Sequence, residues 1–89
     1  MNILFTWNYR KEQLYVDCTL TKSGVNNYDT CITVKDAKYG SPLFQFKILN
    51  ILGEQQYKIY HGCPGIALLK DIGEVILQQF DIIRPCHLN

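Results

Sequence analysis

Several features that identify common classes of protein are missing from this sequence. Its six glycines form neither GxGxxG nor GxxxxGK(S/T), so no nucleotide-binding loop is predicted. No apolar run approaches the roughly 20 residues of a membrane-spanning helix. The N-terminal residues, MNILFTWNYRKEQ, carry no basic run followed by a long apolar core and do not resemble a secretory signal. We therefore expect a cytoplasmic protein that does not use a membrane as its partner.

An excess of charge of one sign is also missing. Nine Lys and Arg residues oppose eight Asp and Glu residues, which gives a net charge of +1 at pH 7, and the basic residues are scattered along the chain. Proteins that bind duplex nucleic acid usually gather basic residues on one face, because counterion release supplies much of their affinity. We therefore expect no direct nucleic-acid partner. The balance of charge equally excludes an acidic mimic of DNA.

Apolar residues, in contrast, are plentiful. Hydrophobic residues make up 47% and aromatic residues 12% of the 89 positions. Disordered chains carry too little apolar area to offset their conformational entropy, so this composition indicates a folded chain. A chain of this length is short for a second core. We predict a single domain spanning residues 1–89.

The strongest pattern lies in residues 64–80. Apolar residues recur there at helical spacing: Ile66, Leu68, Leu69, Ile72, Val75, Ile76 and Phe80. Polar residues fall on the opposite side: Lys70, Asp71, Glu74 and Gln78. Pro64 suits the first helical turn, where its missing N–H is not needed. Gly73 costs a helix about 1 kcal/mol relative to alanine and indicates close approach of another backbone. The pattern predicts one amphipathic helix with one face to bury.

Most of the preceding sequence alternates with the period of a β-strand. Alternating segments occupy residues 3–10, 14–21, 30–35, 43–52 and 57–61. In the first hairpin the predicted inward set is Phe5, Trp7, Val16, Cys18 and Leu20, and the predicted outward set is Tyr15, Asp17 and Thr19. Ile82 and Ile83 could add a short edge strand. The fold class is therefore α+β: an antiparallel sheet of five to six short strands, with one C-terminal amphipathic helix packed on one face.

The alternation changes phase within residues 43–52, and this change bears on function. Leu49 and Ile51 fall on the side that is otherwise polar. In one interpretation they form an exposed apolar patch, which together with Tyr15 and Tyr60 would bind a protein partner. In the other, a bulge near Asn50 shifts the strand and places Leu49 and Ile51 under the helix. The sequence supports the two interpretations equally.

A cysteine at the corner before the helix is the leading candidate for catalysis. A helix N-terminus stabilises a thiolate, which would make Cys63 reactive, and His61 could act as its base. No motif identifies a third residue that would orient His61. A small structural cysteine explains the same position, so we predict no catalytic residue.

The cysteines and histidines could also bind a metal or form disulfides. The possible zinc ligands are His61, Cys63, Cys86 and His87, but their spacing differs from that of paired zinc knuckles. We therefore predict no metal and no cofactor. The four cysteines, Cys18, Cys31, Cys63 and Cys86, are irregularly spaced. In a reducing compartment we expect them to be thiols that are mostly buried.

These observations favour a small non-enzymatic protein-interaction module. Its expected partner is another protein or a second copy of the chain, as a homodimer. A chain of this size could be a phage- or mobile-element-type inhibitor that binds and blocks a larger host enzyme, such as a defence nuclease. The predicted partner-binding residues are Tyr15, Leu49, Ile51 and Tyr60. The alternative is a thiol-dependent enzyme or redox protein that uses Cys63, with His61 as base.

Overall fold

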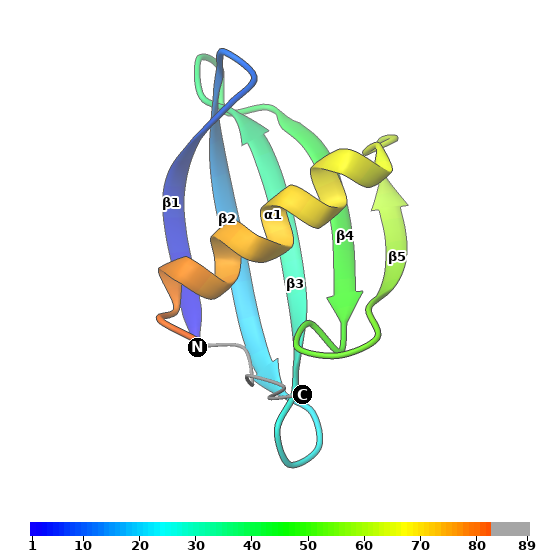
Figure 1. Ribbon diagram of the computed structural model, residues 1–89. Coiled ribbons are helices and arrows are strands. Elements are labelled where there is room, and N and C mark those ends of the chain that lie inside the picture. Colours follow the sequence, from blue (N-terminus) through cyan, green and yellow to red (C-terminus); the bar gives the residue numbers. More distant parts are fainter. Residues whose placement is uncertain (83–89) are drawn as a thin grey trace.

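A computed structural model of the chain describes residues 1–82 and contains one sheet and one helix (Figure 1). The elements are β1 (Asn2–Tyr9), β2 (Glu12–Lys22), β3 (Tyr28–Asp36), β4 (Pro42–Leu49), β5 (Gln56–His61) and α1 (Ile66–Gln79). All neighbouring strands are antiparallel, and their order in the sheet is β1-β2-β3-β4-β5. The predicted α+β class is confirmed. Ile82 is not part of a strand, and Ile83 lies outside the described residues.

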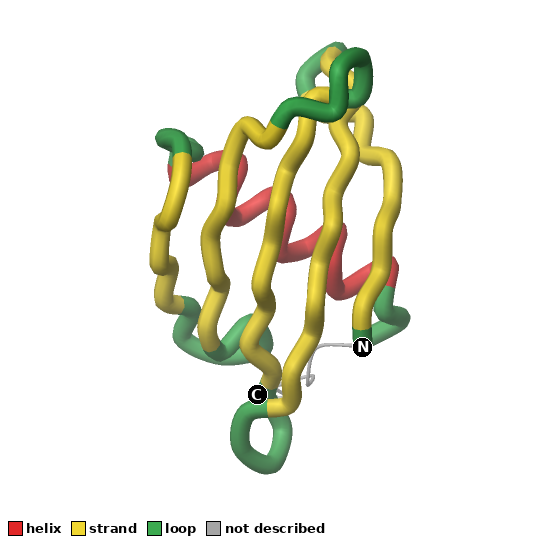
Figure 2. The backbone as a smooth tube through the Cα atoms, turned by 180° about the vertical axis from the view of Figure 1, so that it is seen from behind, coloured by secondary structure: helices red, strands yellow, loops and turns green. Residues whose placement is uncertain are grey.

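Helix α1 crosses one face of the sheet diagonally, from the β5 side to the β1 side (Figure 1). We call this the inner face. The fully buried apolar side chains of the core come from this face, from the turn after β4 and from the helix. They are Val16, Cys18, Val34, Phe46, Ile48, Ile51, Ile72 and Ile76. The opposite face, here called the outer face, is not covered by any element of residues 1–82 (Figure 2). Burial of apolar area on one face only explains the alternation seen in the sequence.

The helix begins two residues later than the sequence pattern predicts. Its first residue is Ile66, which is 57% exposed, and Gly65 is the N-cap. Pro64 lies in the connecting segment and not in the first turn. The inference from Gly73 is also wrong, because a Cβ there would meet the Gln55 side chain at 3.6 Å and the Ile48 side chain at 3.9 Å. Side chains, not another backbone, surround Gly73.

The polar pair Lys11-Glu12 predicts the turn of the first hairpin, and the structure places the turn between β1 and β2 one residue earlier. Tyr9 pairs with Glu12, so Arg10 and Lys11 form a two-residue turn. Both have positive φ, 48° and 68°, as a type I′ turn requires. Asn and Gly usually occupy such positions, and because Arg10 and Lys11 stand there instead, the sequence did not mark the exact position of the turn.

The turn after β4 removes Ile51 from the predicted partner-binding patch and confirms, for Ile51 but not for Leu49, the alternative that a change near Asn50 buries the side chain under the helix. Asn50 adopts a positive φ of 56°, which ends the strand at Leu49. Asn50 N–H then donates to Asp29 Oδ1 at 3.1 Å, and Leu52 N–H donates to Asn27 Oδ1 at 2.9 Å. Between them, Ile51 N–H donates to the Tyr28 carbonyl oxygen at 2.9 Å. These bonds turn the chain inward, and Ile51 is 0% exposed. It lies in the core and not on the outer face.

The corner between β5 and α1 depends on a glycine. Gly62 has a φ of 79°, and a Cβ at this position would collide with the carbonyl oxygen of Leu43. The same Cβ would lie 2.7 Å from Phe44 Cδ1. Only glycine therefore allows β5 to pass this close to the start of β4 before the chain crosses to the inner face.

Candidate functional site

The outer face is the largest uncovered part of the sheet. Its side chains come from alternate residues of all five strands: Leu4, Thr6, Tyr15, Asp17, Thr19, Cys31, Thr33, Lys35, Gln45, Lys47, Leu49, Lys58 and Tyr60. Three of these are large exposed hydrophobic residues, namely Leu4, Tyr15 and Tyr60. The others are mainly polar, so the face is a mixed surface and not a continuous apolar patch.

Tyr60 projects from an irregular part of the sheet. Phe46 pairs with Ile59, and Gln45 pairs with His61, which leaves Tyr60 as the extra residue of a β-bulge. Bulges change the direction of a side chain and increase the local twist. Tyr60 is 54% exposed, and Lys47 Nζ lies 5.8 Å from the centre of its ring. This contact holds the ring beside the β4 strand.

A shallow hollow of about 350 Å³ lies at the centre of the outer face. It is lined by Asp17, Thr19, Cys31, Ile32, Thr33, Gln45, Phe46 and Tyr60. Within residues 1–82, the side chains of Asp17, Thr33 and Gln45 make no hydrogen bond to another residue. A carboxylate, a hydroxyl and an amide are therefore available to a bound molecule beside the aromatic ring of Tyr60.

The β4–β5 side of the outer face is basic. Lys47 lies directly opposite Lys58 on the neighbouring strand. Like charges in such a pair destabilise a sheet by up to about 1 kcal/mol. A carboxylate on a bound partner would relieve this repulsion, so the geometry suits an acidic group near Lys47 and Lys58.

The structure brings three of the four predicted partner-binding residues to the outer face. Tyr15 is 40% exposed, on β2, and Tyr60 lies three strands away, on β5. Leu49 is half-buried in a separate hollow of about 220 Å³ near one end of β4. Ile51 belongs to the core, as described above. The predicted apolar patch of Leu49 and Ile51 therefore does not exist, and the two residues separate at Asn50.

Sequence reasoning missed the central hollow beside Tyr60. The alternation within residues 30–35 and 43–52 predicts that Cys31, Thr33 and Gln45 lie on the polar side, and that orientation is correct. Nothing in the sequence gave the order of the strands. The sheet order shows that the hollow lies over β2 to β5 and that Tyr60 forms part of its lining.

The alternative site at Cys63 is not assembled in the structure. Cys63 and His61 are both exposed, and no hydrogen bond joins them. The helix begins at Ile66, so Cys63 is not within its first turn. Cys86 and His87 lie outside the described residues. In the part of the chain that the structure describes, no three His, Cys, Asp or Glu side chains are placed to bind a metal ion.

The three described cysteines are free thiols in two different environments. Cys18 is buried on the inner face, and burial, with a smaller effect of Asp17, raises the pKa of its thiol to about 12. Cys31 lies exposed in the central hollow, and Cys63 is exposed at the corner before α1. The expectation of mostly buried cysteines is therefore wrong for two of these three residues.

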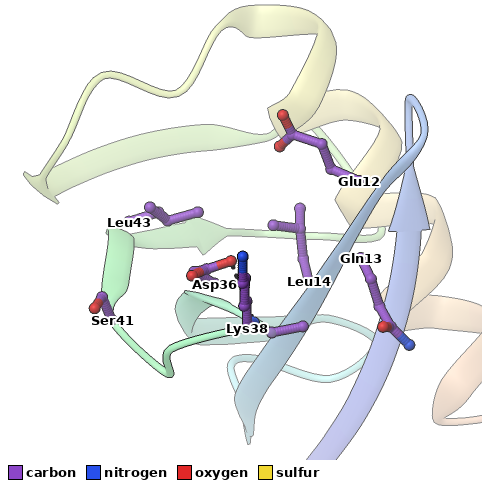
Figure 3. Close-up of a pocket in the computed structure, with 8 residues that line it drawn as sticks. Glu12, Gln13, Leu14, Asp36, Lys38, Ser41 and Leu43 are labelled. Carbon is purple, nitrogen blue, oxygen red and sulfur yellow. Dashed lines mark hydrogen bonds between the residues drawn. The ribbon is translucent and has the colours of Figure 1, made fainter.

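A further hollow, of about 670 Å³, lies at one end of the sheet (Figure 3). In Figure 3, Asp36 lies close to Lys38, with Leu14 and Leu43 on either side. Both carboxylate oxygens of Asp36 accept backbone hydrogen bonds of its own turn, from Lys38 N at 3.3 Å and Tyr39 N at 3.1 Å. Asp36 therefore stabilises the β3–β4 turn, and we assign no binding role to this hollow.

Comparison of the chain with protein families, curated proteins and solved structures finds no match. Within residues 1–82, no helix has both the length and the apolar character needed to cross a membrane.

Proposed function

We propose that this protein is a non-enzymatic module that binds a protein partner with the outer face of its sheet. The supporting observation is the arrangement of Tyr15 and Tyr60, two exposed tyrosines on β2 and β5, with a polar hollow beside Tyr60, on a face that no described element covers. Tyrosine is enriched at the energetic centres of protein interfaces, because its ring supplies area and its hydroxyl supplies a hydrogen bond.

The chemistry of the outer face specifies what the partner must offer. Lys47 and Lys58 favour an acidic group on the partner, and the polar groups of Asp17, Thr33 and Gln45 can form hydrogen bonds with it. A folded protein surface offers these groups together. We propose a larger enzyme, such as a defence nuclease, which the bound domain inhibits by covering its surface. A domain of 89 residues without an assembled catalytic site in its described part can act in this way by binding alone.

The test compares the outer face with a matched surface elsewhere. The double variant Tyr15→Ala/Tyr60→Ala removes both rings, and Tyr39→Ala removes a ring that is 75% exposed in the β3–β4 turn. The partner is captured from a lysate of the source organism, identified by mass spectrometry and then purified for titration. We expect the double variant to weaken binding roughly 100-fold, because interface tyrosines contribute about 1 to 2 kcal/mol each. Tyr39→Ala should leave the dissociation constant unchanged.

Two results would overturn the proposal. Equal affinity of the wild type and Tyr15→Ala/Tyr60→Ala for the captured protein would exclude the outer face as its binding surface. Binding of a labelled single-stranded oligonucleotide at low salt, lost in the same variant, would assign the face to nucleic acid, because exposed aromatic rings beside lysines also stack bases. All variants should retain the thermal midpoint of the wild type, since neither tyrosine is buried.

A further inference from the structure

We infer that two copies of this chain associate by pairing their β1 strands edge to edge. This interface differs from the outer face, and the inference does not rest on the proposed function. β1 forms one edge of the sheet, and no element of residues 1–82 pairs with its outward side (Figures 1 and 2).

The hydrogen bonds at the end of β1 show which backbone groups face the free edge. Met1 N donates to the Leu20 carbonyl oxygen at 3.0 Å, and Leu20 N donates to the Met1 carbonyl oxygen at 2.7 Å. Because antiparallel pairs alternate, the odd-numbered residues of β1 bond to β2 and the even-numbered residues point away. The edge therefore presents about eight backbone donors and acceptors, from Asn2, Leu4, Thr6 and Asn8.

β1 lacks the features by which most edge strands avoid pairing with other chains. Its eight residues, NILFTWNY, include no charged residue and no proline, and its register with β2 is regular throughout. Natural edges are usually interrupted by charges, prolines or bulges. The opposite edge, β5, has such protection, because it is shorter, carries Lys58 and contains the bulge at Tyr60. Leu4 is 68% exposed on β1, which adds apolar area beside the free edge.

A second copy fits this edge because β1 is compatible with itself in the reverse direction. A two-fold axis at Phe5 would pair Leu4 with Thr6 of the second copy, and Asn2 with Asn8 of the second copy. No like charges within the two strands would then oppose one another. On the inner-face side, Ile3 would lie opposite Trp7 of the second copy, and both side chains are only half-buried in one chain. The pairing would join the two sheets through about eight backbone hydrogen bonds.

Multi-angle light scattering of the full chain tests the inference. We expect the wild type to have twice the mass of one 10.3 kDa chain. Thr6→Pro removes an N–H that points away from β2, so it should disrupt the dimer while leaving the bonds between β1 and β2 intact. We expect this variant to have the mass of one chain and the circular dichroism spectrum of the wild type.

A charge-exchange pair tests the register and remains informative if Thr6→Pro does not fold. Leu4→Lys/Thr6→Lys should give a monomer, because each lysine would face a lysine of the second copy. Leu4→Lys/Thr6→Glu should remain dimeric, because each pair would then carry opposite charges. A wild-type mass of 10.3 kDa at every concentration up to the solubility limit would overturn the inference. Equal masses for the Lys/Lys and Lys/Glu variants would overturn the β1 pairing.

Discussion

The two faces of this sheet are made by the same strands and have opposite character. Along β3, Val34 is 0% exposed beneath α1, whereas its neighbour Thr33 lines the hollow of the outer face. On β2, Cys18 is buried and the adjacent Thr19 is exposed. The inner face is committed to stability, because removing its side chains from water drives folding. The outer face contributes little to that core, and its side chains are therefore free to serve in binding.

The largest expected effect comes from placing the same charge on each face. Val34→Asp buries a carboxylate without a partner and should unfold the domain or destabilise it by more than about 4 kcal/mol. Thr33→Asp is its neighbour on the outer face and should change the free energy of unfolding by less than about 1 kcal/mol. Urea denaturation measures both. Similar losses for the two variants would contradict the distinction between the faces.

A smaller loss of stability is expected from a change at Gly62, where the chain crosses to the inner face. Gly62→Ala should destabilise the domain by about 3 kcal/mol, because its Cβ would collide with the Leu43 backbone and its φ is 79°. Gly73→Ala is the control within the helix. There the Cβ has room, and we expect stabilisation of up to about 1 kcal/mol. Thermal melting of Gly62→Ala and Gly73→Ala measures both effects. Destabilisation by Gly62→Ala alone would show that the corner before α1 needs glycine, whereas equal destabilisation would show that the domain does not tolerate alanine at either position.

The turn that divides Leu49 from Ile51 can be tested through Asn27. Its Oδ1 accepts hydrogen bonds from Leu52 N at 2.9 Å and Tyr28 N at 2.9 Å. Asn27→Ala should cost about 2 kcal/mol of unfolding free energy, because two partly buried N–H groups lose their acceptor. The neighbouring Asn26 is exposed, and Asn26→Ala should have no measurable effect in the same urea titration. Equal changes in unfolding free energy for Asn27→Ala and Asn26→Ala would show that other contacts stabilise the turn after β4.

The smallest effect is a pH dependence of stability that arises from the buried thiol of Cys18. Since burial raises the pKa of Cys18 from 9.0 to about 12, the unfolded state loses this thiol proton first as pH rises. The contribution to stability is complete below pH 9 and declines from pH 9 toward pH 12. Other groups also titrate there, so the comparison is with Cys18→Ala. We expect the wild type to lose about 1 kcal/mol per pH unit more than Cys18→Ala, by urea denaturation. If the free energy of unfolding fell equally with pH in the wild type and in Cys18→Ala, burial would not raise the pKa of Cys18.

The sequence predicted what depends on periodicity. Phe5, Trp7 and Val16 alternate with polar neighbours because each strand of the sheet buries one side, and the predicted orientations are confirmed. The spacing of Leu69, Ile72 and Ile76 likewise predicted a helix with one buried face, and that face is confirmed. Such patterns are local, so no knowledge of the strand order was needed.

The sequence could not predict what depends on contacts between distant residues. Ile51 is buried because Asn27, Tyr28 and Asp29, more than 20 positions earlier, bind the turn that follows β4. The hollow beside Tyr60 depends on the strand order and on a bulge between β4 and β5. The alternation of residues within β4 or within β5 does not reveal the strand order or the bulge.

Cys31 provides the most direct test of the claim that the outer face binds a partner. It lies in the central hollow, and Cys63 is a second exposed thiol at the corner before α1. The measurement is the rate of iodoacetamide alkylation at each cysteine, by peptide mass spectrometry, in the free protein and in the purified complex. We expect alkylation of Cys31 to slow at least 10-fold in the complex, because an interface core excludes solvent, while Cys63 keeps its rate. An unchanged rate at Cys31 in the complex would contradict the account.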